Sequence, residues 1–222
     1  MMKLRGVQFG DHHTADDWGL IMHEKIVSPP VPKTNYVSVP GRDGDLDLTE
    51  ALSGVVNYQD RTASFTFLLT NGSHADRDEL IAEIVGALHG QSMKIIDTDD
   101  YPDYYMTGRI MIQEVTNNNA YGVIKLQVVC RPWRYAINQA GKTVSVAASD
   151  GTVPVSLTNK GYKTVTPSIT VTGSVTITYG TTSTSLSAGT YTLPGLLLSP
   201  GLNRVTVSGA GSVTFTYREA IF

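Results

Sequence analysis

The sequence predicts a mainly β protein with two domains, an N-terminal β domain that carries one α-helix and a C-terminal β-sandwich. Charged residues make up only 17% of the 222 residues, and Thr, Ser and Gly take their place, which favours strands joined by many turns. Only one segment has a helical pattern, whereas many short segments alternate between apolar and polar residues. The composition also changes abruptly near residue 142, which indicates two domains.

The domain boundary is predicted from the distribution of charge. Residues 143–222 contain only six charged side chains, which are Asp150, Lys160, Lys163, Arg204, Arg218 and Glu219. The preceding segment holds most of the charge, both tryptophans and all five histidines. We therefore expect a first domain over 1–138, a second over 143–222, and a short linker at 139–142.

The single helix is expected from Ser73 to about Gly90. Ser73 can cap it, and Asp76 lies in the first turn, where the helix dipole favours negative charge. One face is apolar at helical spacing, and Gly90 can end the helix; the apolar residues are Leu80, Ile81, Ile84, Val85 and Leu88. The pattern is typical of an amphipathic helix that covers a sheet.

Strands are expected around this helix at 64–69, 93–97, 104–112 and 123–129. The last two are separated by an Asn-rich stretch at 117–122, which is typical of a hairpin loop. Within 123–129 the apolar residues Ile124, Leu126 and Val128 alternate with their neighbours, as in a strand with one buried face.

The second domain consists almost entirely of short segments with period-two alternation, punctuated by glycine about every ten residues. The alternating residues are Ile169, Val171, Val175, Ile177, Tyr179, Val205, Val207, Val213, Phe215 and Tyr217. Evenly spaced short strands of this kind predict an antiparallel sandwich or jelly roll.

Charge and hydropathy argue against two classes of partner. The net charge is −3 and no cluster of Lys and Arg occurs, whereas a nucleic-acid binder needs a concentrated positive patch. The longest apolar run, at 196–198, lies between Pro-Gly pairs and is too short to cross a membrane.

No motif of catalysis or metal binding is present, so the chain is predicted to be non-enzymatic, with no cofactor and no metal. Cys130 ends a strongly periodic strand, which suits a buried apolar residue better than a reactive thiolate. His12 and His13 are neighbours without a third ligand at suitable spacing, so we expect an exposed loop pair.

Two acidic clusters could in principle supply oxygen ligands for calcium. One comprises Asp43, Asp45 and Asp47, and the other Asp97, Asp99, Asp100 and Asp103. Neither has the glycine and distal glutamate of a calcium loop. We interpret the first as a solvated strand face and the second as a polar turn, while calcium binding stays open.

A carbohydrate-binding module is the alternative function for the second domain. Such modules stack sugar rings on exposed Trp or Tyr side chains, and this half of the chain has no Trp. Tyr179 and Tyr217 share the register of core positions, which leaves Tyr162 and Tyr191 as candidate platforms.

In order and spacing, the chain resembles the siphophage distal tail protein family over nearly its whole length. The matching segments are DWGL at 17–20, VPGRDGDLDLTEAL at 39–52, the strand ASFTFLL, the helix ending in LHG, IIDTDDYPDYYMTGRI at 95–110, CRPW at 130–133, PGL at 194–196 and PGLN at 200–203. No single motif decides the resemblance.

The resemblance implies a structural hub of the phage tail tip. Its N-terminal domain would be similar to tail-tube proteins and would form a hexameric ring, and its C-terminal domain would be galectin-like. The ring would connect the tail tube to the tail-tip protein and, in some phages, to receptor-binding proteins. The protein would be assembled in the bacterial cytoplasm and reside in the virion.

The stretch Gly41, Arg42, Asp43 and Gly44 follows Pro40 and offers both charges on a flexible loop. One interpretation is a contact with another subunit or a neighbouring protein, since head-to-tail contacts of β domains can close into a ring. The other interpretation is a plain hairpin turn.

Overall fold

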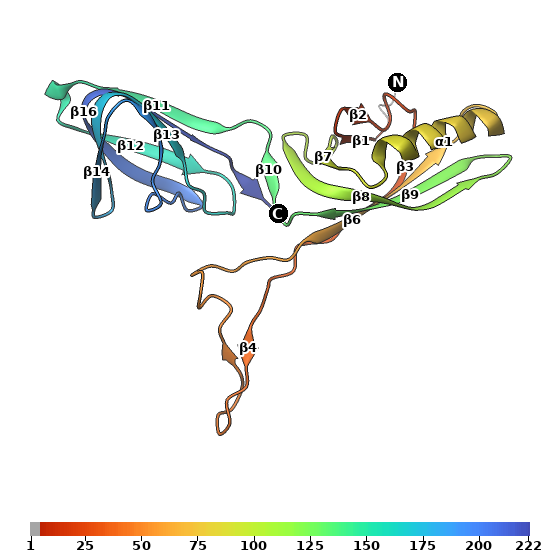
Figure 1. Cartoon of the computed structure of the whole chain (residues 1–222), viewed down its shortest axis with the longest axis horizontal. Coiled ribbons are helices and arrows are strands. Elements are labelled where there is room, and N and C mark those ends of the chain that lie inside the picture. Colours follow the sequence, from red (N-terminus) through yellow and green to blue (C-terminus); the bar gives the residue numbers. More distant parts are fainter. Residues whose placement is uncertain (1–4) are drawn as a thin grey trace. The chain divides into compact units, whose positions relative to one another are not determined.

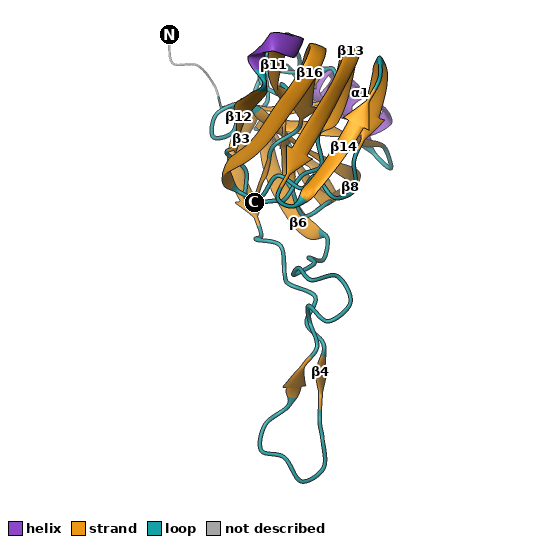
Figure 2. Ribbon diagram, turned by 90° about the vertical axis from the view of Figure 1, so that its left-hand side faces the viewer, coloured by secondary structure: helices purple, strands orange, loops and turns teal. Residues whose placement is uncertain are grey.

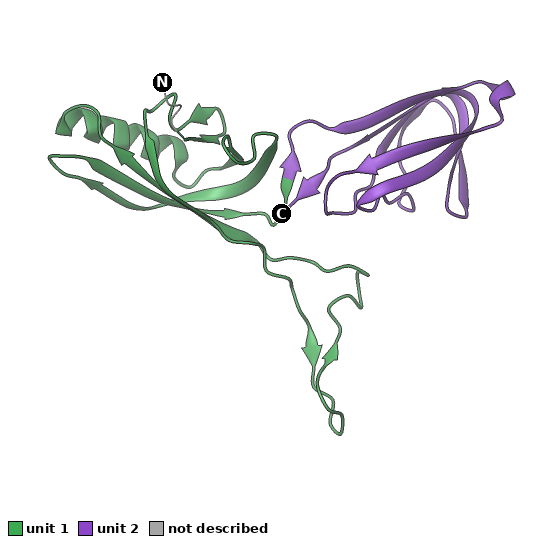
Figure 3. Ribbon diagram, turned by 180° about the vertical axis from the view of Figure 1, so that it is seen from behind, with its two compact units in different colours: residues 1–134, 222 green, residues 135–221 purple. Residues whose placement is uncertain are grey.

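The computed structural model describes residues 5–222. The chain divides into two compact units, one formed by residues 1–134 with Phe222 and the other by residues 135–221 (Figure 3). The expected linker at 139–142 is wrong, because Ala140, Gly141 and Lys142 begin strand β11 (Ala140–Val146) and pair with β16 (Gly201–Tyr217). The boundary between the two units therefore lies before Tyr135, earlier in the chain than the change in composition.

Unit 1 is built on one antiparallel sheet with the strand order β2-β1-β7-β8-β9-β6-β3. The predicted strands at 64–69, 93–97, 104–112 and 123–129 are confirmed as parts of β6 to β9. The bounds are β1 (Val7–Phe9), β2 (His12–His13), β3 (Ile21–Val27), β6 (Arg61–Leu69), β7 (Ser92–Asp97), β8 (Tyr104–Asn117) and β9 (Gly122–Cys130).

The predicted helix is confirmed as α1 (His74–Leu88), which lies across one face of this sheet (Figure 1). Ser73 and Asp76 form a reciprocal capping box, in which each side chain accepts a hydrogen bond from the other residue's backbone N–H. The helix packs Ile81, Ile84 and Leu88 onto the core, together with Phe9, Phe65, Phe67, Ile110, Ile124, Leu126 and Val128 of the sheet.

Unit 2 is a β-sandwich, as predicted, and both of its layers come from one sheet with the strand order β11-β16-β13-β14. Figure 2 shows these strands side by side. In addition, β12 pairs with β16 and β15 with β13, whereas β10 and β17 pair with each other and belong to the nine-stranded sheet. The bounds not yet given are β10 (Arg134–Ala136), β12 (Thr152–Asn159), β13 (Ser168–Tyr179), β14 (Thr182–Leu186), β15 (Gly189–Thr192) and β17 (Ala220–Ile221), and a 3-10 helix (Ala148–Asp150) follows β11.

The two long strands, β13 and β16, run through both layers. In one layer, residues 168–171 of β13 pair with β15 and residues 211–217 of β16 pair with β11. In the other layer, residues 175–179 of β13 pair with β14 and residues 201–208 of β16 pair with β12. The change between layers falls where Gly173 faces Gly211. Apolar side chains from both halves form one core that includes Val155, Ile169, Val171, Ile177, Val207, Val213 and Phe215. The sandwich therefore arises from a single sheet that folds over itself at glycines.

Within residues 5–222 no helix has the length and apolar character needed to cross a membrane.

Candidate assembly surface on an extended arm

The most unusual feature of unit 1 is an extended hairpin between β3 and β6, residues 28–60, which we call the arm. Figure 1 shows that it leaves the ends of these strands and extends away from the sheet. Strands β4 (Tyr36–Val37) and β5 (Leu46–Asp47) pair near its tip, and Pro32 pairs with Tyr58 near its base. Backbone hydrogen bonds continue this ladder, such as Lys33 N–H to Asn57 O at 2.8 Å.

The arm has no core of its own. None of residues 31–60 is buried, and a two-stranded hairpin in water is marginal without packing against other elements. It nevertheless exposes a series of apolar side chains, which are Val31, Tyr36, Val37, Val39, Leu52 and Val55. Exposed apolar surface along an unpaired strand edge is typical of a segment that is covered by a partner.

The arm also borders an open hollow of about 560 Å³. The chain after β5 turns back on itself, with Ala51 N–H bonded to Leu48 O at 3.1 Å and Gly54 N–H to Glu50 O at 2.8 Å. This turn and the opposite strand line the hollow with Pro32, Thr34, Tyr36, Asp47, Thr49, Glu50, Ala51, Gly54 and Val56. Polar side chains such as Asp47 and Thr49 and apolar ones such as Val56 share its walls.

The stretch Gly41, Arg42, Asp43 and Gly44 lies at the tip of the arm, between β4 and β5. All four residues are exposed, and the turn is closed by Arg42 N–H to Val39 O at 3.2 Å. Gly41 and Gly44 have positive φ angles of 82° and 72°, which favour glycine. The structure therefore places the stretch in a hairpin turn with both charges accessible, a geometry that is compatible with either interpretation of it.

Three aromatic rings hold the base of the arm. Tyr58 meets Trp133 edge-on at 5.5 Å and Phe222 at 4.9 Å, and Trp133 stacks on Phe222 at 4.3 Å. Aromatic pairs in these arrangements stabilise beyond the area that they bury. They fix the position at which the arm joins the sheet.

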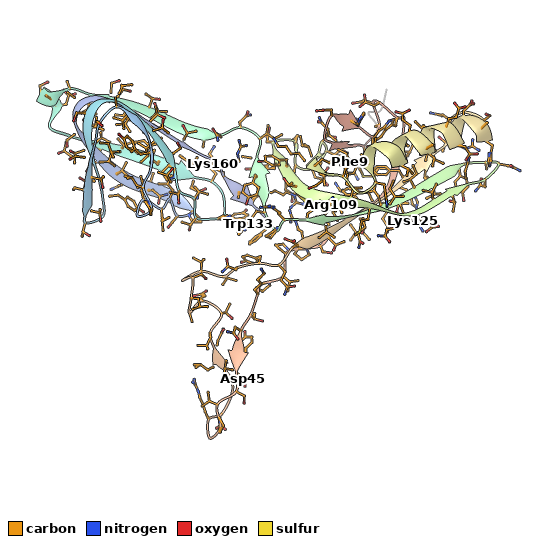
Figure 4. The ribbon with its side chains drawn as sticks, in the orientation of Figure 1. Phe9, Asp45, Arg109, Lys125, Trp133 and Lys160 are labelled. Carbon is orange, nitrogen blue, oxygen red and sulfur yellow. The ribbon has the colours of Figure 1, made fainter. Side chains whose placement is uncertain are left out.

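The acidic cluster of the arm, Asp43, Asp45 and Asp47, lies on exposed backbone; Figure 4 labels Asp45 on the arm, away from the sheet. Hydrogen bonds from the hydroxyl and the backbone N–H of Thr49 hold the pKa of Asp47 below its ordinary value. Within the described part of the chain, no group of three or more His, Cys, Asp or Glu side chains is arranged to hold a metal.

The second acidic cluster is engaged within the fold. Lys25 Nζ lies 2.6 Å from Asp97 Oδ2 and 2.5 Å from Asp100 Oδ2. Asp97 Oδ1 accepts the backbone N–H groups of Asp99 and Asp100, and Asp99 Oδ2 accepts that of Gly6 at 3.1 Å. These carboxylates thus connect β3, β7 and Gly6, just before β1. The polar turn predicted from the sequence therefore links neighbouring strands, and we call Lys25 with Asp97 and Asp100 the Lys25 clamp.

Replacing Lys25 with Met is expected to lower the free energy of unfolding by about 2 kcal/mol at pH 7, because the buried Asp97 carboxylate loses its cation. Lys25 lowers the pKa of Asp100 from its ordinary 3.8 through its hydrogen bond and its charge. The stabilising contribution of Asp100 is therefore present above pH 3.8 and is lost as the pH falls through the lowered value. Urea unfolding between pH 3 and pH 7 measures both effects.

The matched control is Lys125→Met, which removes a salt bridge to Glu114 of similar length, 2.7 Å, but on an exposed surface. It is expected to leave stability essentially unchanged. Equal losses in the two variants would contradict the structural role of the Lys25 clamp.

The two candidate sugar platforms, Tyr162 and Tyr191, lie in different surroundings. Tyr191 lies in β15 and its ring covers Gly189, while its hydroxyl is 3.3 Å from Ser187 Oγ. Tyr162 follows β12 in a turn and is 63% exposed. Neither lines the small apolar hollow of unit 2 between β14 and Leu196, and glycan binding stays a prediction.

Cys130, His12 and His13, the reactive side chains considered above, are each engaged by neighbouring residues of the fold. Cys130 is fully buried, and burial raises the pKa of its thiol to about 11. The loop expected for His12 and His13 is wrong, because they form β2, although His12 is exposed as expected. His12 stacks on Trp18 at 4.9 Å, and half-buried His13 has its Nε2 3.1 Å from Thr98 Oγ1. The pair continues the ladder of β1, which orders both residues.

The sequence did not predict the arm as a unit. Its available signal was a run without apolar periodicity that contains Pro29, Pro30, Pro32 and Pro40. Prolines are tolerated at strand edges and not in the middle of a sheet, so they indicate an exposed extended segment.

Comparison with protein-family models finds no match, and comparison with curated proteins finds none either. Among solved structures, the fold is similar to that of the Dit protein of phage SPP1, described as a paradigm of the hub adsorption apparatus in phages that infect Gram-positive bacteria. The likeness has a TM-score of 0.69 at 16% sequence identity and covers 97% of this chain and 99% of that one. The chain thus shares the fold of this phage protein over almost its full length.

Proposed function

We propose that the chain is a structural, non-enzymatic subunit of a phage tail-tip hub, in which copies join through the arm into a closed ring of six. The ring would connect the tail tube to the tail-tip and host-adsorption proteins, and the sandwich of unit 2 would be a galectin-like domain within the virion. The observation that carries the proposal is the arm, residues 28–60, which has no core of its own.

The reach of the arm suits this role. From Pro32 to its tip it runs about ten residues, which corresponds to roughly 30 Å at about 3.3 Å per residue in a strand. A domain of the size of unit 1 has a width of roughly 35 Å. An arm of this length can therefore lie along a neighbouring unit 1, where exposed Tyr36, Val37 and Leu52 would be covered.

The direction of the proposed contact favours closure of the assembly into a ring. The arm of one copy would contact a different surface of the next copy, which is a head-to-tail contact, and such contacts generate rings when the rotation closes. The fold likeness to a protein described as a paradigm of the hub adsorption apparatus supports a place for this chain in a hub.

The test of the proposal is reversal of charge at the tip, Arg42→Glu with Asp43→Lys, followed by assembly with the tail-tube protein of the same phage. If the tip contributes to the contact, the variant forms the ring at least about tenfold less well, since misplaced like charges at an interface cost more than about 1.4 kcal/mol. Sedimentation and negative-stain images measure the ring.

The matched control is Arg42→Lys with Asp43→Glu, which keeps both charges in place and is expected to assemble like the unmodified chain. Because both residues are exposed at a turn, neither variant alters the core. Normal rings from the charge-reversed variant would assign the tip to a plain turn. Loss of the ring on substitution of Tyr36 and Val37 by Ser would then be required for the arm to retain its role.

A further inference from the structure

The segment between β6 and α1 contains Asn71 followed by Gly72, the one Asn-Gly pair in the sequence. It lies beyond Leu69, the end of β6, and just before Ser73, which caps α1. Both residues of the pair are exposed. An asparagine can react with its own backbone when the next residue has no side chain, because the backbone nitrogen of a glycine can approach the side-chain amide without steric hindrance. The pair is therefore a candidate for a spontaneous chemical modification.

The nitrogen that would react is free in the folded chain. Within residues 5–222, the backbone N–H of Gly72 donates to no acceptor, and the side-chain amide of Asn71 makes no hydrogen bond. Gly72 also has a φ of +78°, a conformation that favours glycine. Solvent can thus remove the proton from the Gly72 nitrogen, and the Asn71 amide can rotate toward it without breaking a hydrogen bond.

Asn119, in the loop between β8 and β9, gives an internal comparison. It is exposed like Asn71, and in the described part of the chain its side chain has no hydrogen bond either. The nitrogen that follows it differs, because that of Ala120 carries a side chain and donates to Asn118 Oδ1 at 2.8 Å. The fold therefore holds the nitrogen after Asn119 and leaves the nitrogen after Asn71 available.

We propose that Asn71 is a site of spontaneous deamidation that loosens the start of α1. The Gly72 nitrogen attacks the Asn71 Cγ, the bond from Cγ to the side-chain nitrogen breaks, and ammonia leaves, which closes a cyclic succinimide. Water then opens the ring at either carbonyl. Opening at Cγ gives an aspartate, whereas opening at the main-chain carbonyl gives an isoaspartate, in which the backbone runs through Cγ and is one carbon longer. Each product carries an added negative charge.

The two products differ in their effect on the first turn of α1. An aspartate at 71 places a carboxylate just before the helix N-terminus, where the dipole favours it. The longer isoaspartyl backbone displaces Gly72, whose carbonyl accepts from Arg77 Nη1 at 2.8 Å, and Ser73, whose N–H donates to Asp76 Oδ2 at 2.8 Å. Since these bonds fix the first turn, the isoaspartyl form is expected to have a lower midpoint of thermal unfolding than the aspartyl form.

The experiment incubates the full, folded chain in mildly alkaline buffer. Anion exchange separates the form with the added charge, peptide mass mapping locates the change, and enzymatic methylation detects isoaspartyl carboxylates. We expect the initial rate at Asn71 to exceed that at Asn119 by at least about tenfold, because the Gly72 nitrogen is neither crowded nor hydrogen-bonded. The isoaspartyl form should unfold at a lower temperature than the variant Asn71→Asp, which reproduces the other product.

Asn71→Gln is expected to abolish the charged form, because glutamine would have to close a larger ring, and the matched control Asn119→Gln should retain it. Both positions are exposed and lie outside the helices and strands, so neither variant alters the core. The Asp-Gly pairs at 43–44 and 150–151 gain no charge if they isomerise, so the charged form distinguishes Asn71 from them.

Three results would overturn the proposal. These are an Asn71 that stays intact in the folded chain while the urea-unfolded chain reacts, equal rates at Asn71 and Asn119, and an isoaspartyl form as stable as Asn71→Asp. The reaction takes place within one chain and needs no ring, so its failure leaves the proposed function standing.

Discussion

Gly173→Ala is expected to lower the free energy of unfolding of unit 2 by about 3–5 kcal/mol, from backbone strain and overpacking together. Gly173 has a φ of +87°, and a Cβ at this position would lie 2.3 Å from the carbonyl oxygen of Ala210. That oxygen belongs to β16, the neighbouring strand at the bend, so it cannot move without disrupting the ladder. The sandwich depends on this bend, because both layers share β13 and β16.

The matched control is Gly180→Ala, in the turn between β13 and β14. Gly180 also has a positive φ, +60°, but a Cβ there would meet nothing within 4 Å. Its cost is expected to be about 1 kcal/mol, from backbone conformation alone. Urea unfolding followed by circular dichroism measures both variants, and similar losses at the two positions would show that the bend does not require close approach of the strands.

Arg77→Met is expected to destabilise unit 1 by about 3 kcal/mol. The substitution removes three hydrogen bonds, two of which join the first turn of α1 to the β8–β9 hairpin, and it leaves the carbonyl oxygens of Gly72 and Asn118 without their donor. Hydrogen exchange should accelerate at the start of α1 and in the turn near Asn118, because these two segments separate more readily.

Arg109→Met serves as its control. Arg109 makes a single hydrogen bond, to Gly90 O, on an exposed surface, and its replacement is expected to cost less than about 1 kcal/mol. A loss below about 1 kcal/mol for Arg77→Met would contradict the conclusion that this arginine connects the helix to the hairpin.

The elements that could be predicted from the sequence are those determined by local pattern. The helix was predictable because Ser73, Asp76 and the apolar face of α1 act within a few residues of one another. The strands β6 to β9 were predictable because one face of the sheet is buried, which produces an alternation that is clearest in β9.

The arm could not be predicted in this way. The arm has no buried face within the chain, so no periodicity marks it, and its fold depends on a backbone ladder with exposed side chains. The linker at 139–142 was misplaced because a change in composition does not mark the boundary between packed units. That boundary lies where β10 pairs with β17.

The mass of the chain in solution, measured by light scattering over a range of concentrations, tests the assembly account most directly. The account predicts a species of six times the 24.0 kDa of one chain, alone or with the tail-tube protein, which disappears when residues 33–57 of the arm are replaced by a short Gly-Ser turn. A chain that stays at the mass of one copy with every tail protein offered, or a ring that persists without the arm, would contradict it.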